Sequence, residues 1–273
     1  MRKPRYTDCR VIVSGNFVEV FKYREPFMFY DDESASPITP KETKPSPREP
    51  QPPNEEARKR SLMRTRGQLR RVVNTNCFRW LDSANKPIRP KFITLTFADN
   101  ITSVPEANEQ YVRFIKRLNY HVFKSKQSEA QYTAVIEFQK RGAVHYHIVF
   151  YNLPFVPLEA LEQVWGQGFV FIEAVADIPN IGAYMIKYLT KESLDERLRD
   201  RKRYFSSRRV KRPVVIRDRH SAYRLMHAFA TTPETHAHPF NDPDNMLERY
   251  IAYDLTISGK FNPEVLQLLE QHR

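Results

Sequence analysis

The chain has 273 residues, 41% of them hydrophobic, and only two cysteines, Cys9 and Cys77. Domains usually span ~100 to 200 residues, so this length predicts one domain with extensions or two small domains. The two distant cysteines fit no zinc-finger spacing and favour a reducing compartment, which we expect to be the cytoplasm. No apolar run reaches the ~20 residues that a helical membrane span needs, so we expect no membrane partner.

The formal net charge is +12, which predicts a polyanionic partner. Nucleic acid is the most frequent partner of such a basic chain. An acidic membrane surface is the alternative, and it predicts a basic amphipathic helix without a cluster of metal ligands in the interior.

The N-terminal segment alternates apolar and polar residues. Residues 11–14 and 17–20 predict a β-hairpin closed by the two-residue loop Gly15-Asn16, so we assign residues 1–33 to an accessory hairpin. Residues 34–53 contain seven prolines among polar residues. This composition cannot bury a core, so it predicts a linker at a domain boundary.

Residues 54–86 predict a basic helix, because apolar residues recur at helical spacing from Leu62 to Leu81. Arginine and lysine crowd its first half. A solvated basic face and a helix that contacts phosphates both explain this pattern. On the second interpretation, the DNA-binding residues of this helix are Arg64, Arg70 and Arg71.

Residues 87–214 predict the core. Strands are expected at 91–99, 132–138, 143–151 and 169–174, with helices starting after Ser103 and at Leu158. The order β-α-β-β-α-β is that of the ferredoxin-like fold in the α+β class, an antiparallel sheet with helices on one face. The other face would remain available for chemistry. A further helix is expected to start at Asp177 or Asn180 and to end near residue 194.

Two histidines lie two residues apart in the apolar strand at 143–151. Side chains alternate faces along a strand, so His145 and His147 point the same way. A three-residue loop over residues 140–142, with a left-handed Gly142, would place Glu137 opposite His145. The three side chains then form a His2Glu metal site with open positions, whereas a two-residue loop would turn Glu137 away.

The helix after residue 180 places two tyrosines beside two lysines. Tyr184 and Tyr188 are four residues apart, and Lys187 and Lys191 lie on the same face. Amphipathic tyrosines at a core edge with lysines reaching the solvent would show the same pattern. On the catalytic interpretation, a metal polarises a scissile phosphate and a tyrosine attacks phosphorus, leaving a 5'-phosphotyrosyl link and a free 3'-hydroxyl.

The chain continues with a strongly basic segment around Tyr204 and Phe205. Aromatic residues in a basic segment suit single-stranded nucleic acid, although a flexible charged loop is the alternative. Residues 215–273 are assigned to a C-terminal extension, in which His236 and His238 are taken as a loop pair without a role in the site. The residues expected to bind DNA in the basic segment are Arg201, Lys202, Arg203, Tyr204, Arg208 and Arg209.

Three segments, FITLTF, HYHIVF and YMIKYLTK, resemble the motifs of the HUH endonucleases in the family's order. The closest resemblance is to rolling-circle replication initiators of bacterial plasmids and small single-stranded DNA phages. It implies that His145, His147 and Glu137 bind Mg2+ or Mn2+, that Tyr184 and Tyr188 are the nucleophiles, and that Lys187 and Lys191 assist them. It also implies origin DNA as the substrate, in a bacterial cytoplasm.

Other functions remain open at this point. A transposase or conjugative relaxase of the same superfamily would use the same chemistry on another substrate. A nucleic-acid-binding module without chemistry would expose aromatic residues in place of the paired histidines. A zinc hydrolase is disfavoured because the chain has no HExxH motif. The chain also has no GxxxxGK[ST] phosphate loop, so a host helicase is the expected partner for unwinding.

Overall fold

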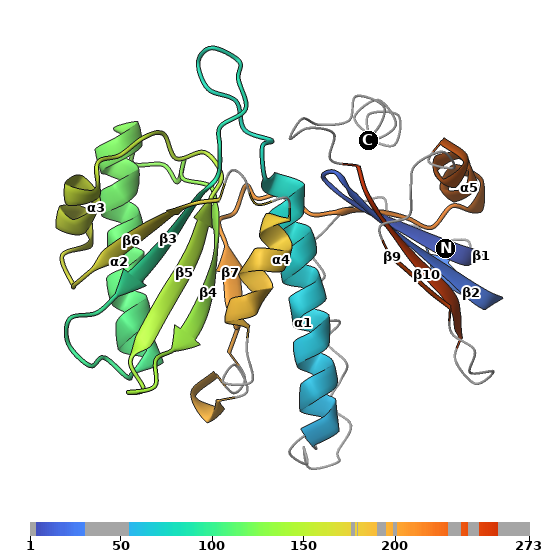
Figure 1. The fold of residues 1–273 in the computed structure, drawn as a ribbon, viewed down its shortest axis with the longest axis horizontal. Coiled ribbons are helices and arrows are strands. Elements are labelled where there is room, and N and C mark those ends of the chain that lie inside the picture. The colour runs from blue at the N-terminus through green and yellow to red at the C-terminus, as the bar shows by residue number, and fades with distance from the viewer. Residues whose placement is uncertain are drawn as a thin grey trace.

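The computed structural model describes residues 4–30, 55–175, 178, 180–189, 195–198, 201–228, 236–239 and 246–255. The predicted linker at residues 34–53 lies outside these ranges. The described residues form two five-stranded antiparallel sheets and five α-helices, which places the protein in the α+β class (Figure 1).

The first sheet is the predicted core. Its strand order is β6-β3-β5-β4-β7, and every neighbouring pair is antiparallel. The first four strands with the helices between them have the ferredoxin-like order β3-α2-β4-β5-α3-β6, as the sequence predicts. The strands are β3 (Lys91–Thr96), β4 (Tyr132–Phe138), β5 (Val144–Phe150), β6 (Val170–Ala174) and β7 (Tyr204–Ser206).

Helices α2 (Val104–Phe123) and α3 (Leu158–Trp165) cover one face of this sheet. Ser103 caps α2 by accepting a hydrogen bond from the backbone N–H of Glu106, which confirms the predicted helix start. Apolar residues at alternate strand positions, such as Ile93, Leu95 and Tyr146, pack beneath both helices. Their strand neighbours therefore point to the opposite face.

The opposite face is covered in part, which differs from the expectation of helices on one face alone. Helix α1 (Glu55–Asn76) and the five-residue helix α4 (Ile181–Met185) pack against it through a second apolar cluster (Figure 1). Asn180 caps α4, as predicted, by accepting a hydrogen bond from the Ala183 N–H. The 3-10 turn η1 (Ile186–Tyr188) continues α4, and a second turn, η3, spans Glu196–Leu198.

The predicted N-terminal hairpin is part of the second sheet. Strands β1 (Pro4–Ser14) and β2 (Phe17–Tyr30) pair around the expected loop at Gly15, which is left-handed with a φ of 62°. Segments far along the chain complete the sheet in the order β8-β1-β2-β10-β9, so the hairpin and the C-terminal segment form one unit. Its other elements are β8 (Val214–Ile216), α5 (Arg219–Ala228), β9 (His236–Pro239) and β10 (Leu247–Asp254).

Asn74 of α1 holds α4 in place. Its side-chain oxygen accepts the Gly182 N–H at 2.8 Å, and its side-chain amide donates to the Asn180 side-chain oxygen at 3.0 Å. A Cβ on Gly182 would collide with the Arg70 carbonyl, and a Cβ on Gly15 would collide with the Asn74 carbonyl. Both glycines therefore permit close packing on the same stretch of α1.

Glu19 of β2 joins the second sheet to α1. Its carboxylate accepts hydrogen bonds from Arg70 at 2.6 Å and from Arg71 at 2.5 Å, and Tyr250 donates a third at 2.9 Å. Burial raises the pKa of Glu19, but the hydrogen bond from Arg71 and the charges of both arginines outweigh burial and hold the pKa below its ordinary value.

We expect Glu19→Gln to lower the free energy of unfolding by about 2 to 3 kcal/mol at neutral pH, because two arginines lose their counterion but keep some contact with water. A carboxylate with a depressed pKa contributes stability above its unfolded pKa of ~4.3, and this stability is lost as the pH falls through the folded pKa. Urea unfolding at several pH values should therefore show the wild type and Glu19→Gln converging in acid.

Glu109→Gln is the matched control. Glu109 is an exposed residue of α2 whose carboxylate lies 3.9 Å from Arg113, and exposed pairs contribute at most ~1 kcal/mol. Equal losses for the two variants would show that the Glu19 pairs do not stabilise the junction.

Candidate metal and tyrosine site

Adjacent strands bring the predicted metal ligands together. The loop from β4 to β5 has the three residues 140–142, with Gly142 at a φ of 88° and the Gln139 N–H bonded to the Ala143 carbonyl. In this register Glu137 pairs with His145, as the sequence predicts. The carboxylate and both imidazoles consequently lie on the sheet face that α2 and α3 leave uncovered.

His147 is buried and fixed through both ring nitrogens. Its Nε2 lies 2.6 Å from the Glu137 carboxylate, and its Nδ1 lies 3.1 Å from the Thr94 hydroxyl. Hydrogen bonds on both sides of an imidazole fix the plane and rotation of the ring. Thr94 is the residue opposite His147 on β3, so the strand register supplies this second contact.

His145 has a different environment. Its Nε2 atom is buried and has no hydrogen-bond partner. Burial, and next the charge of His147, lowers the pKa of His145 to about 4. The ring is therefore neutral at physiological pH, which is the state that a metal ligand requires.

These three residues fit a divalent cation in ligand type. A carboxylate with two neutral imidazoles on one face leaves further coordination positions open, and the unpartnered Nε2 of His145 is the kind of buried polar atom that needs a partner. In the described part of the chain, however, no three His, Cys, Asp or Glu side chains already converge on one point. The Glu137 carboxylate is bonded directly to His147, so a cation would have to displace that contact.

The two tyrosines form a chain of hydroxyl groups that ends on a carboxylate. The Tyr188 hydroxyl donates to the Tyr184 oxygen at 3.1 Å, and the Tyr184 hydroxyl donates to Glu173 of β6. Burial raises the pKa of Tyr184, the hydrogen bond to Glu173 raises it further, and burial also raises the pKa of Tyr188. Both phenols are thus protonated and aligned in this arrangement.

Aromatic contacts join the tyrosines to the histidines. The Tyr188 ring stacks on the His147 ring with centroids 3.8 Å apart and an angle of 22° between the planes. Phe92 lies beneath both tyrosines, with ring centroids 5.3 Å from each. The expected nucleophiles and the expected metal ligands therefore form one continuous site between α4, η1 and the sheet.

The two lysines of this helix have different outcomes. The Lys187 ammonium is exposed and lies 4.5 Å from the centre of the Tyr184 ring, which is a cation–π geometry. Lys191 lies outside the described residues. Lys187 therefore adds positive charge beside the ring of Tyr184 and accepts no proton from its hydroxyl.

Sequence reasoning missed Glu173 and Thr94. Alternation along residues 169–174 could have found Glu173, because Val170 and Ile172 pack in the core and Glu173 must point the other way. Thr94 could have been found in the same manner, from its place between Ile93 and Leu95. What the sequence could not supply is the proximity of Glu173 to Tyr184, which depends on how α4 packs.

The basic residues of α1 are divided between two roles. Arg64 is exposed, and its Nε donates to the Arg60 carbonyl at 3.4 Å. Arg70 and Arg71, which the sequence assigns to DNA, bind Glu19 at the junction with the second sheet. The exposed basic surface of α1 is therefore its first half.

The basic segment at residues 201–209 borders β7. Arg201, Lys202 and Arg208 are exposed. Burial, and then the charge of Arg58, lowers the pKa of Arg203, which places this segment near the first half of α1.

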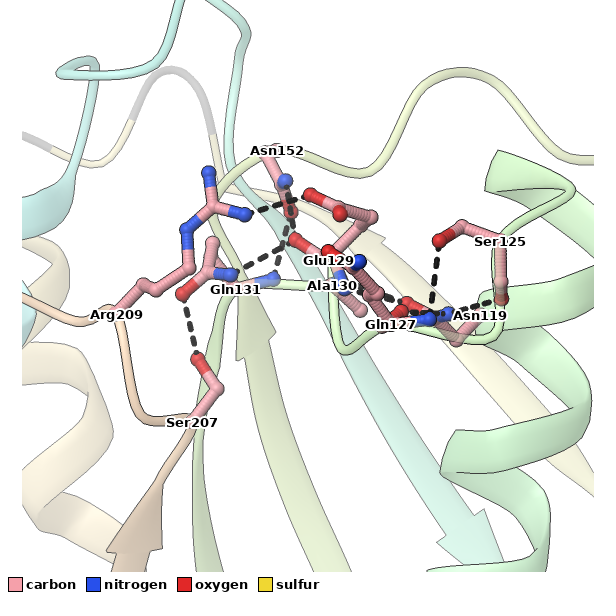
Figure 2. A network of polar contacts seen from close by, with 9 residues as sticks. All are labelled: Asn119, Ser125, Gln127, Glu129, Ala130, Gln131, Asn152, Ser207 and Arg209. Atoms are coloured by element: carbon pink, nitrogen blue, oxygen red, sulfur yellow. Dashed lines mark hydrogen bonds and ion pairs between the residues drawn. The ribbon is translucent and has the colours of Figure 1, made fainter.

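Two further residues of this segment contact the core. Tyr204 is half-buried at the edge of the apolar cluster beneath α1. Arg209 bonds Glu129 at 2.6 Å in a polar network that Asn119, Gln131 and Asn152 extend (Figure 2). Both residues therefore have contacts within the protein itself.

The pair His236 and His238 lies on β9, an exposed strand at the edge of the second sheet, where the sequence suggested a loop. Every residue of the site described above comes from the core sheet or from α4 and η1. No helix in the described ranges has the length and apolar character to cross a membrane.

Residues 90–193 match a family of replication-associated proteins, named for the replication-associated protein ORF2. The match contains both histidines, both tyrosines and Glu137, and it covers less than half of the chain. It supports a role in DNA replication of the replication-initiator type, and with it an interaction with DNA. Searches among curated proteins and among solved structures found no match to the chain.

The depressed pKa of His145 gives a prediction for the protein kept free of metal by a chelator. We expect ring NMR signals of His145 to stay those of neutral imidazole until the pH approaches about 4. The unfolded chain takes up this proton near pH ~6.5, so stability falls as the pH drops from there towards the folded pKa.

His145→Asn should remove that titrating signal and flatten the dependence of stability on pH over the same interval. A His145 ring that titrates at its ordinary pKa would contradict the buried environment described here.

Proposed function

We propose that the protein initiates replication by nicking one DNA strand at an origin through tyrosine attack, and later rejoins the strand. The observation that supports this proposal most strongly is the stacking of Tyr188 on His147, at 3.8 Å between ring centroids. It places a potential nucleophile directly against a potential metal ligand. The family match supports the coarser role in replication.

In the proposed reaction, a phenolate oxygen attacks the scissile phosphorus. The new O–P bond forms as the P–O3' bond breaks, which leaves a 5'-phosphotyrosyl link and a 3'-hydroxyl that can prime synthesis. Attack of the 3'-hydroxyl on the phosphotyrosine reverses the step and rejoins the strand. The step needs no external energy source, because one phosphodiester replaces another.

The hydroxyl chain suggests how a phenol loses its proton. Tyr184 donates directly to Glu173, and Tyr188 donates to Tyr184, so a proton from either phenol can reach the Glu173 carboxylate. Raised pKa values keep both tyrosines protonated before DNA binds. Lys187 stands beside Tyr184, where its charge can offset that of an incoming phosphate.

Glu137, His145 and His147 would hold the divalent cation, Mg2+ or Mn2+. When bound, such a cation neutralises charge on the scissile phosphate. Thr94 positions His147 from the opposite side and so fixes the ligand ring.

For the substrate we propose single-stranded or melted origin DNA, with a host helicase supplying the unwinding. Exposed basic residues support this: Arg64 on α1 and Arg201, Lys202 and Arg208 near β7 offer phosphate contacts. A transposase or relaxase would share the site, and the family match favours the replication role over both.

We expect full-length protein with Mn2+ and single-stranded oligonucleotides tiled across the parent replicon to give a protein–DNA adduct on denaturing gels. Tyr184→Phe with Tyr188→Phe should abolish the adduct, because both candidate nucleophiles are then lost. Each single variant then assigns the cutting and the accepting tyrosine.

Tyr120→Phe is the matched control, since Tyr120 is an exposed tyrosine of α2 on the far side of the sheet. An adduct that persists in the double variant would move the attachment to another residue. Salt-sensitive DNA binding without any adduct would instead favour a binding module.

We also expect Glu137→Ala, His145→Ala and His147→Ala each to weaken Mn2+ binding more than about tenfold in calorimetry, since even outer contacts to metal ligands account for ~10- to 100-fold. His121→Ala, in the last turn of α2, should leave the affinity unchanged. Equal Mn2+ affinity in all four variants would place the cation elsewhere.

A further inference from the structure

Two phenylalanines of β6 are exposed beside the site. Phe169 directly precedes β6 and Phe171 lies within it, and their side chains are 69% and 62% exposed. β6 is an edge strand of the core sheet. Large apolar side chains usually avoid such exposure when they repeat along one strand, so a ligand surface is the expected explanation.

The sheet register places both rings in line with the histidines. Phe171 pairs with Thr94, which pairs with His147, so these three side chains form one row across the sheet. The backbone of Phe169 exchanges hydrogen bonds with Thr96, which pairs with His145. Strands lie about 4.8 Å apart, so each phenylalanine is about 10 Å from its histidine, on the same face.

The surrounding charge suits a polyanion. Arg141 is exposed in the loop that follows β4, and its positive charge contributes to the lowered pKa of His145, so it lies close to the site. Lys187 is exposed on the side of the site where Tyr184 meets Glu173. In the described residues, two aromatic rings and two cationic groups thus border the same stretch of sheet.

We propose that Phe169 and Phe171 form a stacking platform for unpaired bases of the DNA strand next to the scissile phosphate. Aromatic faces beside positive charge are how proteins hold single strands with little dependence on sequence. Residues two apart on a strand are separated by about 7 Å, which leaves room for one base on each ring. The platform would hold the strand in register with the histidines, and it rests on the proposed nicking function for the identity of its substrate.

The aromatic residues that the sequence suggested for stacking have other contacts. Phe205 packs edge-on against Tyr111 at 5.0 Å between centroids, within the core. Tyr204 is half-buried in the apolar cluster beneath α1. Among the residues described, Phe169 and Phe171 are the most exposed aromatic side chains on the face that bears the histidines.

The test measures non-covalent binding in the background Tyr184→Phe/Tyr188→Phe, so that no adduct interferes. Fluorescence anisotropy would follow a labelled oligo-dT of about 20 nucleotides with the full chain, alone and with Phe169→Ala or Phe171→Ala. A stacked base contributes enough affinity that we expect each variant to raise Kd by about 5- to 150-fold. The slope of log Kd against log salt should stay unchanged, because no phosphate contact is lost.

Phe155→Ala is the matched control. Phe155 is 84% exposed in the segment between β5 and α3, so its loss tests for a general effect of exposed rings. Phe171→Trp should retain binding, whereas Phe171→Leu, which keeps apolar area without a ring, should behave as Phe171→Ala. Quenching of 2-aminopurine placed in the oligonucleotide should be lost in Phe171→Ala.

Unchanged affinity in both alanine variants would overturn the platform. It would also be overturned if sedimentation showed a dimer of the chain that the alanine variants dissociate without any change in Kd, since the rings would then bind a second copy. The two proposals fail separately. Weaker oligo-dT binding without an adduct in the wild type leaves the platform and removes the nicking function, and an adduct with unchanged Kd does the reverse.

Discussion

The hydrogen bonds of Asn74 determine where the tyrosines lie. Helix α4 has five residues, too few to be stable by itself, since isolated helices shorter than ~12 residues are marginal in water. Its position therefore comes from outside: Asn74 accepts the Gly182 N–H and donates to Asn180, the residue that caps the helix. Because Gly182 has no side chain, the helix approaches α1 closely enough for these bonds to form. Removing the side chain of Asn74 would leave a buried N–H unsatisfied at the start of the tyrosine helix.

Around that anchor, the site is assembled from groups that no single element could supply. The strands contribute rigid spacing between Glu137, His145 and His147, while α4 and η1 add the phenols. Phe92 fills the space between them and limits the entry of water, which strengthens the polar contacts around it. The mixture of an apolar floor with a few fixed polar groups is typical of binding sites that must both exclude solvent and orient a charged ligand.

Local pattern predicted most of the core sheet and half of the site. The pairing of Glu137 with His145 followed from loop length and strand alternation, and the starts of α2 and α4 followed from Ser103 and Asn180, because these features depend on neighbours in the sequence. The partnership of Glu173 with Tyr184 did not, and neither did the union of the N-terminal hairpin with β10, because both depend on packing between distant segments. Arg70 and Arg71 illustrate the same limit: in the sequence they are two cations in a basic helix, and only the fold shows that they bind Glu19.

The position of α1 in the chain has a consequence for local unfolding. The family match begins at residue 90, after α1 has ended at Asn76, so the support of the tyrosine helix is encoded outside the matched region. The histidine strands are held by the sheet ladder, whereas the tyrosine helix depends on contacts with another helix, so the two halves of the site can open with different free energies. Amide protons near Tyr184 would then exchange faster than those of β5, and the phenols could leave the histidines while the sheet stays folded. The protein thus combines a rigid half and a releasable half in one site, an arrangement that would suit a tyrosine required to move with a DNA end attached to it.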